Sequence, residues 1–196
     1  MTFSLILSMS LFALAASFSP GPVNLISLSS SARHGVKTGL IFVTGATLGF
    51  IVLFLLIGFA LHYLIEQLSW ITQILQWLGI AFLLYLSYQL FTDNGELNSN
   101  RHQSAPSFMT GAIMQWLNPK AWLASVSGIS AYVPQANADE ILIFASLYLP
   151  ICWLSLGVWV GIGKMLGQYF QSPAKMRFMN KALALLLAGS CLLILI

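Results

Sequence analysis

The chain has 196 residues, of which 58% are hydrophobic and only 7% carry a charge. Soluble globular domains carry about 25% charged residues, so this composition excludes a water-soluble globule and a disordered chain. The net charge is +3, but eight Lys and Arg residues in so apolar a background cannot form the phosphate-neutralising stripe of a nucleic-acid-binding protein.

Hydropathy divides the chain into predicted membrane spans, each of which needs about 20 mainly apolar residues. The six spans cover about residues 3–30, 39–63, 68–91, 108–131, 141–168 and 182–196. We expect an all-α, polytopic membrane protein with a three-helix unit over residues 1–91, a polar cytoplasmic linker over 92–107 and a second three-helix unit over 108–196. The last run is short for a span, so five spans and a re-entrant tail are the alternative.

The first span begins near the start of the sequence, where Ala13-Leu14-Ala15 has the A-x-A form of a signal-peptide cleavage site. A signal peptide also carries Lys or Arg before its apolar run, and neither residue stands there in this chain. We therefore expect a retained first membrane helix, and cleavage is the alternative.

Proline interrupts the first span at Pro20-Gly21-Pro22 and the fourth span at Asn118-Pro119-Lys120. A unit of three spans followed by three more must be inverted in the membrane, so the two interruptions take corresponding positions in two inverted units. Interrupted spans at corresponding positions are the best sequence indication of a binding site in a transporter.

Proline breaks the interior of a helix but suits the first position of a new one. We expect new half-helices to begin at Pro22 and at Pro119. The predicted N-cap of the first is Ser19 or Gly21, and that of the second is Asn118.

The two half-helices would direct their positive N-terminal ends toward each other near the middle of the membrane, where Lys120 adds a full charge. A lysine at that depth costs about 2.5–3.5 kcal/mol on insertion scales and indicates function. The alternative is that Lys120 extends to the cytoplasmic interface. We predict that Lys120 binds the carboxylate of a small substrate. The predicted binding residues are Gln115, Asn118, Pro119, Lys120, Pro20, Gly21, Pro22 and Asn24.

The basic residues indicate the orientation of the chain. Seven of the eight lie in or beside the loops after the first, third and fifth spans: Arg33, Lys37, Arg101, Lys164, Lys175, Arg177 and Lys181. The positive-inside rule places these loops in the cytoplasm and both termini outside. We expect Arg33, His34 and Lys37 to set the topology, and a role in a cytoplasmic gate is the alternative.

All five carboxylates fall in loops or at the ends of spans. The span interiors therefore offer no Asp or Glu for a proton relay or for pairing with a cationic substrate side chain, which favours a neutral amino acid. The two cysteines, Cys152 and Cys191, lie in apolar runs without other ligands at metal-binding spacing. We expect buried free thiols, no metal and no cofactor.

The motifs of the chain resemble those of the LysE/RhtB family of amino-acid exporters, in particular its RhtB-like branch. Ser19-Pro20-Gly21-Pro22 with Asn24 is similar to the family's first-helix signature, and the segment from Gln115 to Ala121 is similar to its fourth-helix motif. The chain departs from the family pattern at Val23, where the family often has Asn or Asp, and this bears on the identity of the substrate.

The resemblance implies a multi-pass exporter in the bacterial inner membrane. It also implies that the substrates are small neutral amino acids or derivatives, such as threonine, homoserine, cysteine or O-acetylserine, and that the proton gradient drives export by alternating access. The expected partners are the amino acid, protons and the lipid bilayer. Pairs of glycines four residues apart, such as Gly45 with Gly49 and Gly157 with Gly161, favour close helix packing within the chain, and a homo-oligomer is the alternative.

Two other classes of function are alternatives. Gly128-Ile129-Ser130-Ala131 has the Gly-x-Ser form of an intramembrane, rhomboid-like serine protease. No histidine stands in the interior of a predicted span to activate the serine, and the nearest candidate is His62, at the end of the second span. The second is a non-catalytic membrane scaffold, which leaves the matched interruptions and Lys120 without a role. We therefore predict a transporter rather than an enzyme.

Overall fold

The computed structural model describes residues 2–19, 21–64, 105–133 and 137–169 as continuous segments, together with short stretches between 77 and 92 and between 172 and 188. All the elements in the continuous segments are helices, as predicted. They are α1 (Phe3–Phe18), α2 (Pro22–His34), α3 (Val36–Leu64), α5 (Phe108–Trp116), α6 (Pro119–Tyr132) and α7 (Ala138–Tyr169).

Two of these helices are long and apolar enough to cross a membrane, over Val36–Ala60 of α3 and Ala138–Leu166 of α7. They confirm the second and fifth predicted spans as continuous helices. The first predicted span is a pair of helices, α1 and α2, with a bend of 58° between them. The fourth is likewise two shorter helices, α5 and α6.

The rest of the predicted organisation falls on residues that the structure does not describe in full. The third span (68–91), the linker (92–107) and the sixth span (182–196) lie largely outside the described residues, as does Cys191. The inverted arrangement of two three-helix units therefore stays a prediction.

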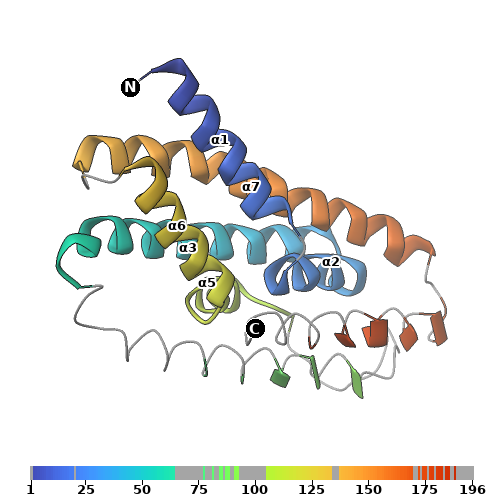
Figure 1. The fold of residues 1–196 in the computed structure, drawn as a ribbon. Helices are drawn as coiled ribbons and strands as arrows, with labels where there is room; N and C mark the ends of the chain where they lie inside the picture. The colour runs from blue at the N-terminus through green and yellow to red at the C-terminus, as the bar shows by residue number, and fades with distance from the viewer. Residues whose placement is uncertain are drawn as a thin grey trace.

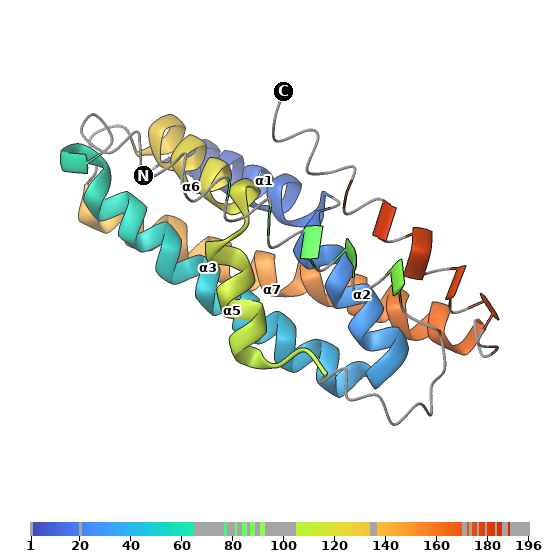
Figure 2. The same cartoon turned by 90° about the horizontal axis from the view of Figure 1, so that it is seen from below.

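The long helices form the centre of the described bundle (Figures 1 and 2). Helix α7 packs against α1, α2 and α3, and α3 packs in addition against α2, α5 and α6. The first interrupted pair therefore packs against both continuous helices, whereas the second packs mainly against α3 and reaches α7 through the ring contact of Tyr132 with Phe144.

The contact between α3 and α5 is unusually close because glycines stand on both sides of it. A Cβ at Gly45 would overlap the carbonyl oxygen of Phe108, and one at Gly111 would overlap the carbonyl oxygen of Phe42. A Cβ at Gly49 would lie 2.7 Å from the Cα of Ala112. The pair Gly45 and Gly49 thus packs within the chain, as expected from the sequence.

An aromatic cluster fills the interior between α1, α3, α6 and α7. Its closest ring pairs are Phe50 with Tyr148, whose centroids lie 4.6 Å apart, and Phe54 with Phe144, at 5.1 Å. Phe12 adds edge-to-face contacts with Phe144. Such geometries stabilise aromatic pairs by about 0.5–1.5 kcal/mol beyond burial alone. The cluster forms a rigid apolar wall on one side of the candidate site.

Replacing Gly45 with alanine should lower the thermal unfolding midpoint of the purified protein in detergent, because the added methyl group forces α3 and α5 apart. Overpacking of this kind costs about 1–3 kcal/mol. The matched control is Gly157→Ala on α7, where a Cβ meets no described atom within 4 Å. Alanine there should leave the midpoint unchanged or raise it, because alanine favours helix more than glycine does. Equal midpoints for the two variants would contradict this account of the α3–α5 contact.

Candidate functional site

The interruption of the first span has the form that the sequence predicts. Helix α1 ends at Phe18, and α2 begins with Pro22 as its first residue and Gly21 as its N-cap. The backbone of Gly21 is fully extended, with φ −168° and ψ 177°, and its carbonyl accepts the first helical hydrogen bond, from Leu25 N–H at 3.0 Å. Gly21 rather than Ser19 therefore caps α2. Pro20 lies outside the described residues.

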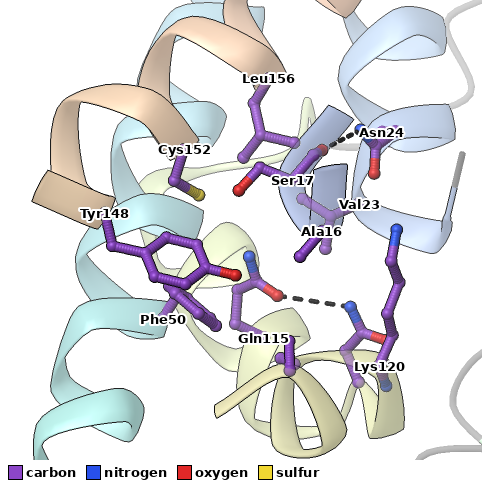
Figure 3. A pocket seen from close by; sticks show the side chains of 13 residues that line it. Ala16, Ser17, Val23, Asn24, Phe50, Gln115, Lys120, Tyr148, Cys152 and Leu156 are labelled. Atoms are coloured by element: carbon purple, nitrogen blue, oxygen red, sulfur yellow. Dashed lines mark hydrogen bonds between the residues drawn. The ribbon is translucent and has the colours of Figure 1, made fainter. Parts of the chain in front are cut away.

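The interruption of the fourth span also begins a new helix at the predicted position. Asn118 is the N-cap of α6, and its side-chain oxygen accepts a hydrogen bond from the Lys120 backbone N–H at 3.1 Å. Pro119 is the first helical residue. The Asn118 amide donates in turn to Gln115 Oε1 at 3.3 Å (Figure 3). The polar residues on the two sides of the interruption are thus held together by one network.

The two interruptions meet through Lys120. Its ammonium nitrogen donates a hydrogen bond of 2.6 Å to the Ser19 carbonyl, 101 positions earlier in the chain. A Cβ at Gly21 would lie 3.2 Å from the same nitrogen, so a side chain at position 21 would crowd it. The ammonium therefore lies between the end of α1, the start of α2 and the start of α6. In this structure the side chain of Lys120 thus reaches the first interruption.

The last carbonyl groups of α1 are hydrogen-bonded by side chains from three other helices. Asn24 of α2 donates to the Ser17 carbonyl at 2.9 Å, and Trp159 of α7 donates to the Phe18 carbonyl at 3.2 Å. Lys120 of α6 supplies the third bond, to Ser19. The final carbonyls of a helix have no partner within the helix, and in lipid no water can replace one. The interruption is thus stabilised by residues of α2, α6 and α7.

A cavity of about 40 Å³ lies at this meeting point. Four of the predicted residues line it, namely Asn24, Gln115, Asn118 and Lys120. A single water needs about 10–15 Å³ by this measure, so the cavity has room for two or three waters. An amino acid would enter only if the surrounding helices moved apart.

The structure adds wall residues that sequence reasoning did not place at the site. Tyr148 and Cys152 of α7 line the cavity, as do Ser17 of α1 and Phe50 of α3. Figure 3 shows the Tyr148 hydroxyl, the Cys152 thiol and the Ser17 hydroxyl turned toward the same space. We expected Cys152 to be a buried thiol, which is confirmed, but its place at the cavity was missed. The available signal was the spacing of Tyr148 and Cys152, one helical turn apart in an apolar span.

Three of the predicted functional residues lie away from the cavity. Arg33 and His34 are in the last turn of α2, and Lys37 is in the first turn of α3. Gly35 joins the two helices with φ +86°, in the left-handed region that favours glycine. Arg33 stands about 14 Å beyond the cavity residue Asn24 along α2. These residues therefore mark one end of the bundle and do not form part of the cavity wall.

The chemistry of the wall is polar but not acidic. Within the described part of the chain, no carboxylate or imidazole lines the cavity, and no group of three His, Cys, Asp or Glu side chains is placed to hold a metal ion. Ser130, the residue of the protease alternative, is exposed and is not a cavity residue. The site offers one cationic donor, amide groups and hydroxyl groups, which suits a small molecule with a carboxylate and a neutral side chain.

Asn118→Ala should destabilise the protein, because it removes the cap of α6 and the bond to Gln115. The loss of an N-cap costs about 0.5–2 kcal/mol. Asn118→Ser restores a capping oxygen and should recover most of the loss in thermal midpoint. If the alanine variant unfolds at the same temperature as the serine variant and the original protein, Asn118 does not have the capping role described.

The sequence matches the family described as LysE type translocator over residues 14–196. A relative from Klebsiella pneumoniae subsp. pneumoniae, named cysteine/O-acetylserine efflux protein, is 28% identical over 165 residues, which cover 80% of this chain and 84% of the relative. Proteins of the same name from Salmonella choleraesuis and Escherichia coli O1:K1 are each 28% identical, over 74% of this chain and 78% of the relative. No solved structure matches the chain.

Proposed function

The chain belongs to the family of LysE type translocators, and we propose that it exports small neutral amino acids or their derivatives from the cytoplasm. Cysteine and O-acetylserine, which the names of the relatives specify, are the first candidates, followed by threonine and homoserine. Its family places it among transporters and not among enzymes. The apolar helices agree with a protein that crosses the membrane several times.

One observation gives the strongest support for the proposed class of substrate. The ammonium of Lys120 stands in the wall of the cavity, where the ends of three half-helices meet. A carboxylate there would form an ion pair with the ammonium, which is stronger than the present hydrogen bond to the neutral Ser19 carbonyl. The side-chain oxygens of Asn24 and Gln115 are the acceptors within reach of the cavity for the amino group of the substrate. The absence of a carboxylate among the described wall residues disfavours a cationic side chain.

The hydrogen bond between Lys120 and the Ser19 carbonyl suggests how substrate binding is coupled to transport. Lys120 belongs to the second predicted unit and Ser19 to the first, so their hydrogen bond links the two units. A substrate carboxylate that takes the ammonium removes this link and allows the units to move relative to each other. The cavity is then exposed first to one side of the membrane and later to the other, as in alternating access between inverted units.

The proposed orientation follows the basic residues. Arg33 and Lys37, at the junction of α2 and α3, lie on the cytoplasmic side of a bacterial inner membrane, and both termini lie on the opposite side. The proposed driving force is the proton gradient. Because no acidic residue is among the described wall residues, the proton would be carried by Lys120 or by the substrate itself.

The alternatives account for less of the geometry. An intramembrane protease requires Ser130 beside a histidine, whereas Ser130 is exposed and separate from the buried polar residues. A scaffold gives no role to a partly buried ammonium, and a lysine in the middle of a membrane costs about 2.5–3.5 kcal/mol on insertion scales.

Efflux from proteoliposomes tests the proposed function. Vesicles are loaded with labelled cysteine, O-acetylserine, threonine, homoserine or lysine, and release is followed with and without an imposed pH gradient. We expect gradient-dependent release of one or more of the four neutral compounds and not of lysine. If correctly inserted protein releases none of them, the amino-acid assignment is wrong.

Lys120→Met tests the proposed binding of the substrate carboxylate by Lys120. A hydrogen bond to a charged group contributes about 1.5–3 kcal/mol, so its loss should lower the apparent substrate affinity roughly 10- to 100-fold. The matched control is Lys164→Met, because Lys164 is exposed near the end of α7 and should leave efflux unchanged. Efflux by Lys120→Met at the original rate and affinity, in protein with an unaltered elution profile, would remove Lys120 from the binding site.

A further inference from the structure

Helix α2 is polar in sequence and yet enclosed on all sides over its first ten residues. Residues 22–31 are buried without exception, and four of them are serines. Two of the serine hydroxyls bond within the helix: Ser27 donates to the Val23 carbonyl at 2.7 Å, and Ser29 donates to the Ile26 carbonyl at 3.3 Å. Such bonds satisfy a hydroxyl without any other partner. The remaining two serines differ in this respect.

Ser30 and Ser31 of α2, together with Ser155 of α7, are only 2–3% exposed. In the described part of the chain, their hydroxyls have no hydrogen-bond partner. An unsatisfied buried hydroxyl costs about 1–3 kcal/mol, and serine can remove that cost by turning to a carbonyl of its own helix, as Ser27 and Ser29 do. Three unsatisfied hydroxyls therefore indicate that their hydrogen-bond partners are present only when the helices are arranged differently.

Two of the unpartnered serines, Ser31 and Ser155, extend polar rows that begin at the cavity. On α2, the helical repeat places Asn24, Ser27 and Ser31 on one face, and Asn24 is a cavity residue. On α7, the same repeat aligns Ser155 with Cys152, which also lines the cavity. The row on α2 leads toward the end that carries Arg33 and His34. On α7, the chain continues from Ser155 to Val160, which lies beside Ser31 at Gly39.

The two rows are brought together by tight contacts between the helices. A Cβ at Gly39 would lie 3.2 Å from the Cβ of Ser31 and 3.0 Å from a methyl carbon of Val160, so α2, α3 and α7 converge there. A Cβ at Gly163 would overlap the carbonyl oxygen of Leu28. Among the described residues, α2 is thus packed closely against α3 at Ser31 and against α7 at Leu28.

The opposite side of the cavity is different. There Phe50 and Tyr148 belong to the aromatic cluster, which continues to Phe54 and Phe144 through ring contacts. Unpartnered hydroxyls thus lead in one direction from the cavity and apolar rings in the other. A zwitterionic molecule would exchange hydrogen bonds with the first wall and not with the second.

We propose that the interface of α2 with α7 is the access route by which the amino acid reaches the cavity from the cytoplasm, with Ser31 and Ser155 lining it. The proposal rests on the exporter function and deepens it. When α2 separates from α7, water and the charged groups of the substrate become the partners that these hydroxyls lack. When the helices close again, as in this structure, Leu28 packs against Gly163 and the route disappears.

Cysteine accessibility tests the route. The variants are Ser31→Cys and Ser155→Cys. They lie on two different helices, so the route can still be tested with one variant if the other fails to insert into the membrane. A positively charged, membrane-impermeant methanethiosulfonate is applied to inside-out and to right-side-out vesicles that hold the full-length protein. Mass spectrometry reads modification at the substituted residue itself, so the native cysteines need no replacement.

The matched control is Ser29→Cys, because Ser29 is a neighbour on the same helix, is equally buried and has its hydroxyl paired within the helix. Lys37→Cys, at an exposed position, shows that the reagent reaches the cytoplasmic side. We expect both route variants to react at least tenfold faster than Ser29→Cys in inside-out vesicles. We also expect them to react at least tenfold faster there than in right-side-out vesicles.

Two results would overturn the route. The first is reaction of both variants at the rate of Ser29→Cys while Lys37→Cys reacts readily. The second is faster reaction from the outer side. Because the labelling needs no knowledge of the transported compound, its failure with intact efflux refutes the route alone. Labelling as expected in protein that releases no amino acid instead refutes the assigned substrate class.

Discussion

The last carbonyl groups of a helix have no partner within that helix, and the described structure is arranged around this constraint at the end of α1. The carbonyls of Ser17, Phe18 and Ser19 accept hydrogen bonds from Asn24, Trp159 and Lys120. These donors come from α2, α7 and α6, so the end of α1 fixes where three other helices stand. Two of these donors, Asn24 and Lys120, also line the cavity, which joins the stability of the fold to its proposed site.

The local features of both interruptions could be predicted from the sequence because proline and capping rules act over only a few residues. Pro22 and Pro119 begin helices, and Asn118 caps α6 through its side chain, as expected. Whether Gly21 or Ser19 caps α2 was left open, since both residue types occur at N-caps. The sequence predicts that Lys120 lies near the first interruption. It does not predict the hydrogen bond to the Ser19 carbonyl, because a bond between residues so far apart in the chain depends on how the whole bundle packs.

The contribution of α7 could not be predicted in the same way. Tyr148 and Cys152 lie in an apolar span whose sequence does not specify which face meets the other helices. The unpartnered state of Ser31 and Ser155 is likewise invisible in the sequence, because every serine can bond to its own helix and only the structure shows which do not. Wall residues of this kind are set by tertiary packing, whereas the interruptions are set by local backbone chemistry.

The contact between α3 and α5 has a mechanical consequence. At Gly45 and Gly111 the two backbones touch with no side chains between them, so the helices cannot come closer, and separating them would open a void. Their spacing at this crossing is therefore fixed. Because α3 belongs to the first predicted unit and α5 to the second, any movement between the two units would have to keep this contact in place.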